Sequence, residues 1–314
     1  MSAQREPKKL RLPRAMDIGR ALSTSPPMPD FVLPGLPIGC VGAVVAPGAT
    51  GKTMLLLQLC AALALGVPVF DEGLFDSAEP PAAPCKVVLV VAEETAELMH
   101  IRLHAVAAEL ARRCAGPDGA LPHDIAGLLA TNLRIYPLAG DLPMRLDERS
   151  ENCFGVEELE AMASGARLVV LDPMRQFHRG EENGSDVMSE VVRVLQGVAY
   201  RTNCAALLAH HTNKWSTTGG QGDRAAAARG SGAFTDAVRW QMNLSELDDA
   251  LAGAYRIDPD DARHHVRVDL AKTNYLPPQP PMVLRRGEAG VLAALTPARC
   301  KSRLKAGRSP KGRA

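Results

Sequence analysis

Apolar residues recur along the chain in short runs, and segments with helical periodicity separate most of these runs. The runs that predict strands are 41–45, 86–91, 133–136, 167–171, 205–208 and 266–270. The segments that predict helices are 53–65, 95–114, 156–164 and 186–202. Strands that are apolar almost throughout and alternate with helices predict an α/β fold, with a mostly parallel central sheet covered by helices on both faces.

The two ends of the chain differ in composition from the middle. Residues 1–28 are polar and basic and then rich in proline, which predicts an arm. Residues 297–314 are predicted to be a tail, since 298–314 hold seven Lys or Arg residues and no acid. The remaining residues, 29–296, are predicted to form one domain. Basic ends of this kind are typical both of nucleic-acid contact and of solvated, disordered termini.

Charge and cysteine content restrict the setting of the protein. The formal net charge of +1 favours no class of partner. The seven cysteines form no Cys-x-x-Cys pair, which favours a reducing cytoplasm. The N-terminus has charges but no apolar signal core. The longest apolar run, 54–70, is interrupted by Gln58, Gly66 and Pro68, so we expect a buried helix and no membrane association.

A glycine-rich loop joins the first predicted strand to the first predicted helix. Its residues are Ala46, Pro47, Gly48, Ala49, Thr50, Gly51, Lys52 and Thr53. A strand, such a loop and a helix in this order are the setting of a P-loop, which surrounds the phosphates of ATP with backbone N–H groups. In this interpretation Lys52 reaches the β- and γ-phosphates and Thr53 holds Mg²⁺. Ala46 departs from the motif, which has glycine at this position.

An acidic residue ends the apolar run 167–171. Asp172 has the position of a Walker B carboxylate, which holds the hydrated Mg²⁺ opposite Thr53. Many strands end in aspartate at a plain turn, and Pro173 follows directly, so a turn is the alternative. The P-loop upstream favours the metal role.

Two glutamates follow the strand predicted at 86–91. An acid at this point can act as a general base that polarises the water attacking the γ-phosphate. The alternative is an acid favoured by the dipole at the start of the next helix. Glu94 fits that alternative better because it lies next to Thr95, so Glu93 is the candidate base.

Two histidines, His210 and His211, continue the apolar run 205–208. A histidine at a strand end can hydrogen-bond the γ-phosphate and report its loss to a neighbouring loop. We prefer His211 as this sensor because it lies nearer the glycine-rich loop 212–229. That loop suits single-stranded nucleic acid, by stacking and phosphate contact, although an exposed disordered loop is the alternative. The candidate DNA-binding residues are Lys214, Trp215 and Arg224.

Three further cations call for an anionic partner. Arg239 lies in the amphipathic segment 236–240, which resembles a strand or a short helix. A γ-phosphate across a subunit interface would make Arg239 an arginine finger, whereas an ordinary Arg–carboxylate pair is the alternative. Arg102 and Lys272 raise the same question.

Taken together, these segments resemble the RepA hexameric replicative helicases of IncQ broad-host-range plasmids, within the RecA/DnaB-like P-loop ATPases. The resemblance spans most of residues 31–290 in the order of the family. It is carried by 46–53, Ala92-Glu93, 100–106, Leu171-Asp172, 175–178, His210-His211, 228–231, 238–241 and 271–275. The P-loop is common to many NTPases, whereas the Arg-x-Phe-His block at 175–178 and the Arg-Trp-Gln block at 239–241 are far more specific.

The resemblance implies a RecA-like ATPase domain that assembles into a homohexamer with ATP and Mg²⁺ between subunits and unwinds DNA 5′-to-3′ in plasmid replication. It implies forked or single-stranded DNA, a plasmid initiator and a primase as partners. The roles that it assigns are phosphate and Mg²⁺ for Lys52 and Thr53, catalytic base for Glu93, Walker B for Asp172, sensor for His211, a finger from the neighbouring subunit for Arg239, and a place near the catalytic centre for Arg102. The chain departs from the family pattern at Ala46, at Glu94-Thr95 and in the central loop, and these departures bear on substrate contacts more than on ATP hydrolysis.

The sequence therefore predicts an ATP-dependent DNA helicase. The alternative is a RecA-like DNA-binding ATPase that mediates or regulates recombination without processive unwinding. A metabolic kinase is a third hypothesis, against which the lack of an obvious lid for a small substrate speaks weakly.

Overall fold

The computed structural model describes residues 14–71, 73–75, 83–115, 124–147, 152–180, 185–211 and 232–296. The chain divides into two units between Asp30 and Phe31, and each unit is described by itself. In the first unit, helix α1 (Ile18–Ser23) begins where the Asp17 side chain accepts a hydrogen bond from the Arg20 backbone N–H at 3.0 Å. The arm predicted at 1–28 thus contains a helix that the sequence analysis did not anticipate.

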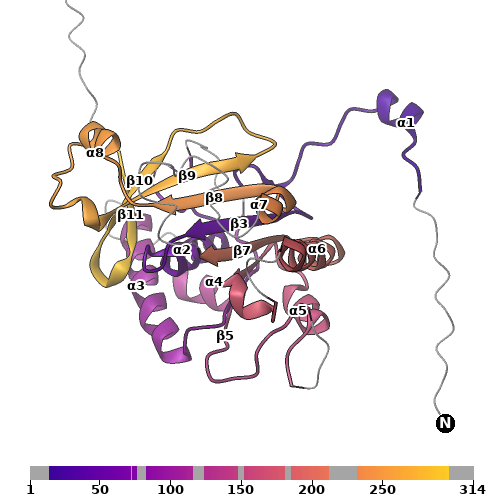
Figure 1. Ribbon diagram of the computed structural model, residues 1–314, viewed down its shortest axis with the longest axis horizontal. Helices are drawn as coiled ribbons and strands as arrows, with labels where there is room; N and C mark the ends of the chain where they lie inside the picture. The colour runs from indigo at the N-terminus through magenta and orange to yellow at the C-terminus, as the bar shows by residue number, and fades with distance from the viewer. Residues whose placement is uncertain are drawn as a thin grey trace, which may run out of the picture. The chain divides into compact units, whose positions relative to one another are not determined.

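A nine-stranded sheet forms the centre of the second unit (Figure 1). In spatial order its strands are β11 (Leu292–Leu295), β10 (Met282–Arg286), β9 (His265–Thr273), β8 (Trp240–Ser245), β3 (Val41–Ala46), β7 (Ala205–His211), β6 (Leu168–Asp172), β4 (Val87–Val91) and β5 (Leu133–Pro137). From β8 to β5 all neighbours are parallel. The pairs β8–β9, β9–β10 and β10–β11 are antiparallel. The mostly parallel sheet is therefore confirmed, and its antiparallel side is an addition to the prediction.

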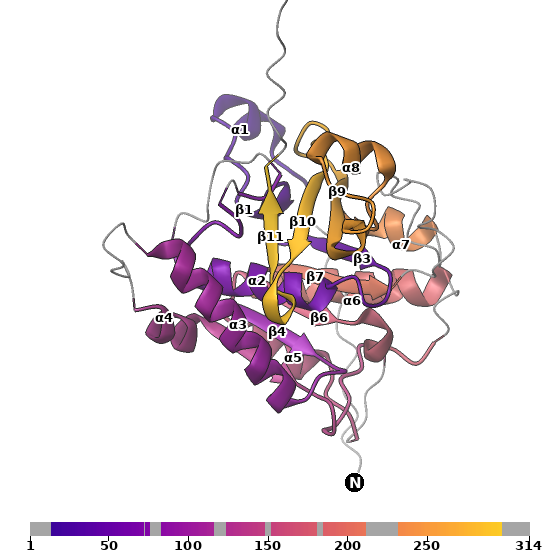
Figure 2. The ribbon, with the colours of Figure 1, turned by 90° about the vertical axis from the view of Figure 1, so that its left-hand side faces the viewer.

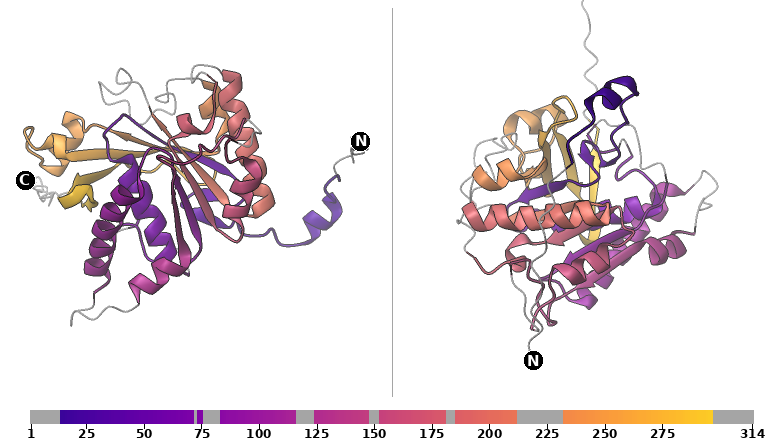
Figure 3. Two further views of the ribbon diagram at one scale, coloured as in Figure 1. Left: turned by 90° about the horizontal axis from the view of Figure 1, so that it is seen from below. Right: turned by 90° about the vertical axis from the view of Figure 1, so that its right-hand side faces the viewer.

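Helices cover both faces of this sheet (Figure 3). One face packs against α2 (Lys52–Leu65), α3 (Ala96–Cys114) and α4 (Ile125–Asn132). The other packs against α5 (Val156–Ala163), α6 (Ser185–Thr202) and α7 (Gly232–Ala237). The remaining elements are the two-stranded sheet of β1 (Phe31–Leu33) and β2 (Leu36–Pro37), helix α8 (Asp249–Tyr255), and the 3₁₀ turns η1 (Met174–Phe177), η4 (Ala262–His264) and η5 (Glu288–Gly290). Within the described parts of the chain, no helix is long and apolar enough to span a bilayer.

The alternation of side chains along each strand explains the two cores. In β3, Val44 and Ala46 belong to the core beneath α2, whereas Ala43 and Val45 belong to the core beneath α6. Successive residues of a strand point to opposite faces, so a strand buried on both faces must be apolar at almost every position. This is the pattern from which the parallel strands were predicted.

Parallel pairing brings the ends of these strands to one edge of the sheet. Ala46 of β3 lies opposite His211 of β7, and Val91 of β4 lies opposite Asp172 of β6. His210, His211 and Asp172 therefore lie at the ends of strands, and the P-loop and Glu93 follow strands, that all end at the same side of the sheet.

The segment 236–240 is neither the single strand nor the single short helix that was predicted. Helix α7 ends at Ala237, and β8 begins at Trp240. Val238 and Trp240 are buried and Arg239 is exposed, because this stretch carries the chain from the helix into the sheet.

The β10–β11 hairpin packs against α2, beside the P-loop (Figure 2). The Gln58 side-chain amide of α2 donates to the Leu292 carbonyl at 2.8 Å and accepts from the Leu292 N–H at 2.9 Å. Gln58 is 4% exposed and Leu292 is 1% exposed. One amide therefore satisfies both backbone groups of an edge-strand residue and joins the hairpin to the helix that carries Lys52.

Gln58→Leu should destabilise the fold, because it leaves the N–H and C=O of Leu292 buried without partners. The expected loss in the free energy of unfolding is about 2–4 kcal/mol, measured by urea denaturation. Gln279→Leu is the matched control, since the described bond of the Gln279 amide is to the carbonyl of Pro277, two residues away in the segment before β10. Equal stability of the two variants would contradict the role of Gln58.

Candidate active site

The P-loop passes from β3 into α2 through two left-handed residues, Ala49 with φ of 62° and Gly51 with φ of 96°. Glycine adopts this conformation without steric cost, which explains Gly51 at the start of the helix. The Thr50 hydroxyl donates to the Pro47 carbonyl at 2.7 Å and closes the loop on itself. A Cβ added at Gly48 would meet no atom within 4 Å, so the main chain there is open to close approach.

Four predicted site residues lie together at the end of this loop. Nζ of Lys52 lies 3.2 Å from Oδ1 of Asp172 and 3.3 Å from Nε2 of His211. The Thr53 hydroxyl donates to Oδ2 of Asp172 at 2.6 Å. Lys52 and Asp172 are 4% and 3% exposed, so their charges are almost fully withdrawn from water and compensate each other.

The oxygens of Thr53 and Asp172 fit a magnesium ion. Mg²⁺ binds in proteins through one or two hard oxygen ligands, with water and substrate phosphates completing its shell. The hydroxyl and the carboxylate are hydrogen-bonded to each other, so both can turn to one ion. When bound, the ion would neutralise and polarise the phosphates of a nucleotide.

Comparison with known proteins identifies the family. The AAA_25 family model, described as an AAA domain, matches residues 6–217. The chain belongs to the AAA_25 family. The matched residues include the P-loop, Glu93, Asp172 and both histidines, and the family is one of AAA-type ATPase domains.

Two solved structures share the fold of this AAA_25 protein. The first, described as an ATPase domain, aligns with a TM-score of 0.52 at 15% identity, over 82% of this chain and 85% of that chain. The second, a DnaB-like replicative helicase described with its interactions with primase, aligns with a TM-score of 0.52 at 14% identity. That match covers 82% of this chain but 59% of the helicase, so the AAA_25 protein spans less than two thirds of that relative. These likenesses place the fold among RecA-like ATPase domains.

The two histidines at the end of β7 point to opposite faces of the sheet. His211 contacts Lys52, as described above, whereas His210 is 2% exposed and packs against the ring of Phe234, with ring centroids 5.1 Å apart. Burial, followed by the charge of Lys52 and the proximity of His211 and His178, lowers the pKa of His210 to about 4. His211 is therefore the member placed to sense a phosphate, and that role stays a prediction.

The two glutamates after β4 have different partners. Oε1 of Glu94 forms an ion pair with Nη2 of Arg102 at 2.6 Å. Glu93 is exposed, and its Oε1 accepts a hydrogen bond from Nε2 of Gln176 at 2.9 Å. Arg102 thus pairs with Glu94, the residue after the candidate base, whereas the described partner of Glu93 is the uncharged amide of Gln176. The catalytic roles of Glu93 and Arg102 stay predictions.

Arg239 lies at the amino ends of the parallel strands, whereas the P-loop follows the carboxyl end of β3. Its backbone N–H donates to the carbonyl of Val41, the first residue of β3, whereas the P-loop begins at Ala46, the last residue of that strand. The side chain is exposed, and within the described residues its guanidinium forms no ion pair. Arg239 therefore takes no part in the site of its own chain.

Lys272 lies near Arg239 and is held by the fold. Its Nζ donates to the carbonyls of Thr235 at 2.6 Å and Asp236 at 3.3 Å in the last turn of α7. Burial lowers the pKa of Lys272, and the charge of Arg239 acts in the same direction. Lys272 thus stabilises α7. The candidate DNA-binding residues Lys214, Trp215 and Arg224 lie outside the described residues.

The sequence analysis missed two side chains at the site, Gln176 and Arg286. Nη2 of Arg286 at the end of β10 donates to the carbonyl of Thr50 in the P-loop at 3.2 Å. The apolar run that begins at Met282 and the glycines at 287 and 290 are typical of a hairpin and would have indicated this strand. No local pattern indicates that Gln176 meets Glu93, because the two residues are distant in the sequence.

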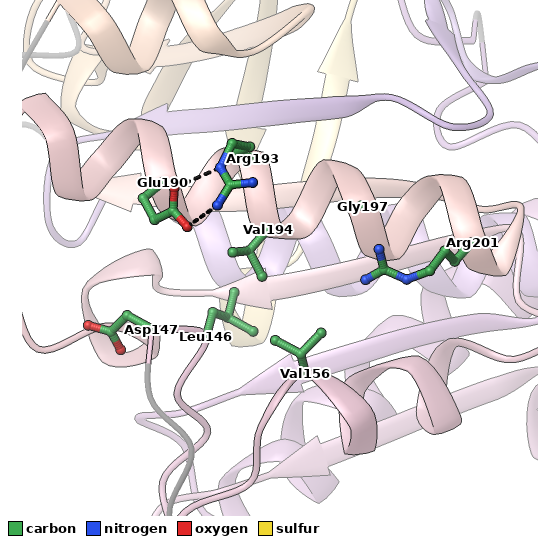
Figure 4. A pocket seen from close by; sticks show the side chains of 8 residues that line it. All are labelled: Leu146, Asp147, Val156, Glu190, Arg193, Val194, Gly197 and Arg201. Atoms are coloured by element: carbon green, nitrogen blue, oxygen red, sulfur yellow. Dashed lines mark hydrogen bonds and ion pairs between the residues drawn. The ribbon is translucent and has the colours of Figure 1, made fainter. Parts of the chain in front are cut away.

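A cavity of about 460 Å³ lies away from this site, against α6 (Figure 4). It is lined by Leu146, Asp147, Val156, Glu190, Arg193, Val194, Gly197 and Arg201. Glu190 and Arg193 pair with each other one turn apart on α6, and none of the described site residues lines the cavity. The cavity therefore does not change the assignment of the active site.

The fold should lose stability in mild acid through His210. Its pKa is lowered in the folded state to about 4 from the ordinary value of 6.5, so the stabilisation is full above pH 6.5 and is lost as the pH falls toward 4. Between pH 7 and pH 5 the loss from this group is about 2 kcal/mol. Urea denaturation at both values should show a smaller difference for His210→Gln. The control is His100→Gln on the exposed surface of α3. The same pH dependence in wild type and His210→Gln would contradict this account.

Proposed function

We propose that this AAA_25 protein is an ATP- and Mg²⁺-dependent DNA helicase that acts as a hexameric ring. The observation that carries the proposal is that the charged residues lie at both ends of the parallel strands of one sheet. Lys52, Thr53, Asp172 and His211 gather at one edge, and Arg239 projects from the other. Such a division suits an ATP site that is completed by a neighbouring copy.

The distance along the sheet supports this arrangement. Five residue steps separate Val41 from Ala46, which corresponds to about 16 Å along a strand. An arginine side chain is shorter than this, so Arg239 cannot reach the P-loop of its own chain. In a ring of identical subunits, one edge of each subunit meets the other edge of the next, and Arg239 would face the γ-phosphate bound by its neighbour.

The residues at the P-loop edge have complementary tasks in hydrolysis. Lys52 binds the β- and γ-phosphates, and Glu93 orients the attacking water as a general base. His211 lies beside Lys52 and would lose a hydrogen-bond partner when the γ-phosphate leaves. Because β7 continues into the segment that begins at residue 212, this loss is expected to move the loop that carries the candidate DNA contacts.

The DNA substrate and its setting rest on less direct support. The two solved structures reported above are described as an ATPase domain and a replicative helicase, which favours a helicase over a kinase. The resemblance to RepA helicases of IncQ plasmids supports 5′-to-3′ unwinding of forked DNA in plasmid replication, with an initiator and a primase as partners. Lys214, Trp215 and Arg224 remain the proposed DNA contacts.

Wild-type protein with ATP and Mg²⁺ should separate the strands of a forked duplex, and Lys52→Ala should abolish both ATP hydrolysis and unwinding. The reason is that Lys52 supplies the buried cation of the phosphate site. A strand-displacement assay and a phosphate-release assay measure the two activities. Lys86→Ala, at an exposed lysine before β4, is the matched control and should retain both.

Full unwinding by Lys52→Ala would contradict the mechanism. ATP hydrolysis by the wild type without strand separation would favour the recombination mediator instead, and hydrolysis that single-stranded DNA does not stimulate would favour a kinase. Native mass determination with ATP and Mg²⁺ should give six chains, and a monomer under these conditions would contradict the ring.

A further inference from the structure

We infer that Gln176 is the positioning residue for the catalytic base Glu93. The inference deepens the proposed function and rests on its ATPase part, not on DNA unwinding. It is carried by one contact, the hydrogen bond from Nε2 of Gln176 to Oε1 of Glu93 at 2.9 Å, and by the way the fold immobilises both residues.

The chemistry of this contact suits a base. The Gln176 amide donates a hydrogen bond but carries no charge, so it orients the carboxylate without neutralising it. Among the described residues this bond engages Oε1 of Glu93, and Oε2 is the oxygen that would accept a proton from water. The next residue, Glu94, differs, because its partner is the charged guanidinium of Arg102. Of the two adjacent acids, the one held by a neutral donor is the one equipped to take up a proton.

The backbone around Gln176 is fixed on every side. Its N–H donates to the Pro173 carbonyl at 3.0 Å, and its carbonyl accepts a hydrogen bond from Nη1 of Arg145. The flanking side chains of Met174 and Phe177 have no exposed surface. The Gln176 side chain therefore projects from a turn whose backbone is held by hydrogen bonds, so its Cα is already in place to bring the amide to Glu93.

A strap formed by residues 144–147 holds this turn from outside. The Leu146 N–H donates to the Phe177 carbonyl at 2.9 Å, and Oδ2 of Asp147 accepts from the Arg179 N–H at 2.8 Å. Met144 and Leu146 are buried in the same apolar cluster as Met174 and Phe177. Arg145, Leu146 and Asp147 of the strap thus each hydrogen-bond to the segment from Gln176 to Arg179.

The same turn is continuous with the metal-binding strand. Asp172 ends β6 directly before Pro173, and the Ala92 N–H donates to the Asp172 carbonyl at 2.8 Å. Glu93 follows Ala92. The metal ligand and the base are thus tied by one backbone hydrogen bond, and Gln176 adds a side-chain tie between the same two segments. These two hydrogen bonds fix Glu93 relative to Asp172, the residue that would hold the metal ion.

Gln176→Leu, Glu93→Gln and the double variant form a cycle that tests this inference. Gln176→Leu keeps an uncharged side chain of comparable bulk and removes the donor, so kcat for ATP hydrolysis should fall about tenfold while KM stays within about twofold. Glu93→Gln should lower kcat by about 100-fold or more. The double variant should equal Glu93→Gln alone, since Gln176 acts only through Glu93. Gln279→Leu, distant from the site, should behave as wild type.

Three results would overturn the inference. They are an unchanged kcat in Gln176→Leu, a double variant whose losses multiply, and a Glu93→Gln variant with wild-type kcat. A raised KM with unchanged kcat would show that Gln176 serves nucleotide binding instead. If the wild type hydrolyses ATP without unwinding DNA, the helicase proposal fails, and the cycle still decides the role of Gln176 from hydrolysis alone.

Discussion

The rest of the site depends on the compensation of one buried charge, the ammonium group of Lys52. A charged amine withdrawn from water costs several kcal/mol unless an opposite charge and hydrogen bonds compensate for it. Asp172 and His211 supply this compensation from two further strands, β6 and β7. The order β3–β7–β6 in the sheet, and the parallel register that aligns the ends of these strands, are therefore conditions for placing Lys52 where it lies.

The same sheet also keeps Arg239 away from the P-loop of its own chain. Because β3 and β8 are parallel neighbours, the residue before β8 must lie at the amino end of β3, a full strand length from the P-loop. Arg239 occupies this position and is exposed, whereas Lys272 beside it is engaged with α7. One cation at this edge thus has a structural partner, and the other is directed outward. If Arg239 contacts a γ-phosphate, that phosphate must be bound by the P-loop of another copy of the chain, and the ATP site is then shared between two copies.

The structure shows which parts of the fold and the site the sequence encodes locally. The parallel strands were predictable because burial on both faces requires apolar residues at successive positions, as in 87–91 and 168–171. The P-loop was predictable because its backbone geometry restricts the residues that fit, as at Gly51. The proximity of Asp172 to Thr53 followed from the rule that parallel strands end at one edge.

The parts that were missed depend on contacts between distant segments. Strand β9 is buried only in part and carries Arg267 and Asp269, which bond to each other, so its polar pattern concealed its length. Two hydrogen-bonded pairs join residues far apart in the chain, Gln58 with Leu292 and Gln176 with Glu93. No periodicity or motif indicates such pairs, because neither Gln58 nor Gln176 belongs to a local pattern that points to its partner.

The claim that the ATP site is shared between neighbouring copies is tested most directly by mixing two inactive variants. Lys52→Ala retains Arg239, and Arg239→Ala retains Lys52, so each protein alone should hydrolyse almost no ATP. An equimolar mixture that exchanges subunits should recover about a quarter of the wild-type rate, since about a quarter of its interfaces combine an intact Lys52 with an intact Arg239. A mixture as inactive as its components, or an Arg239→Ala protein with wild-type activity, would contradict the account.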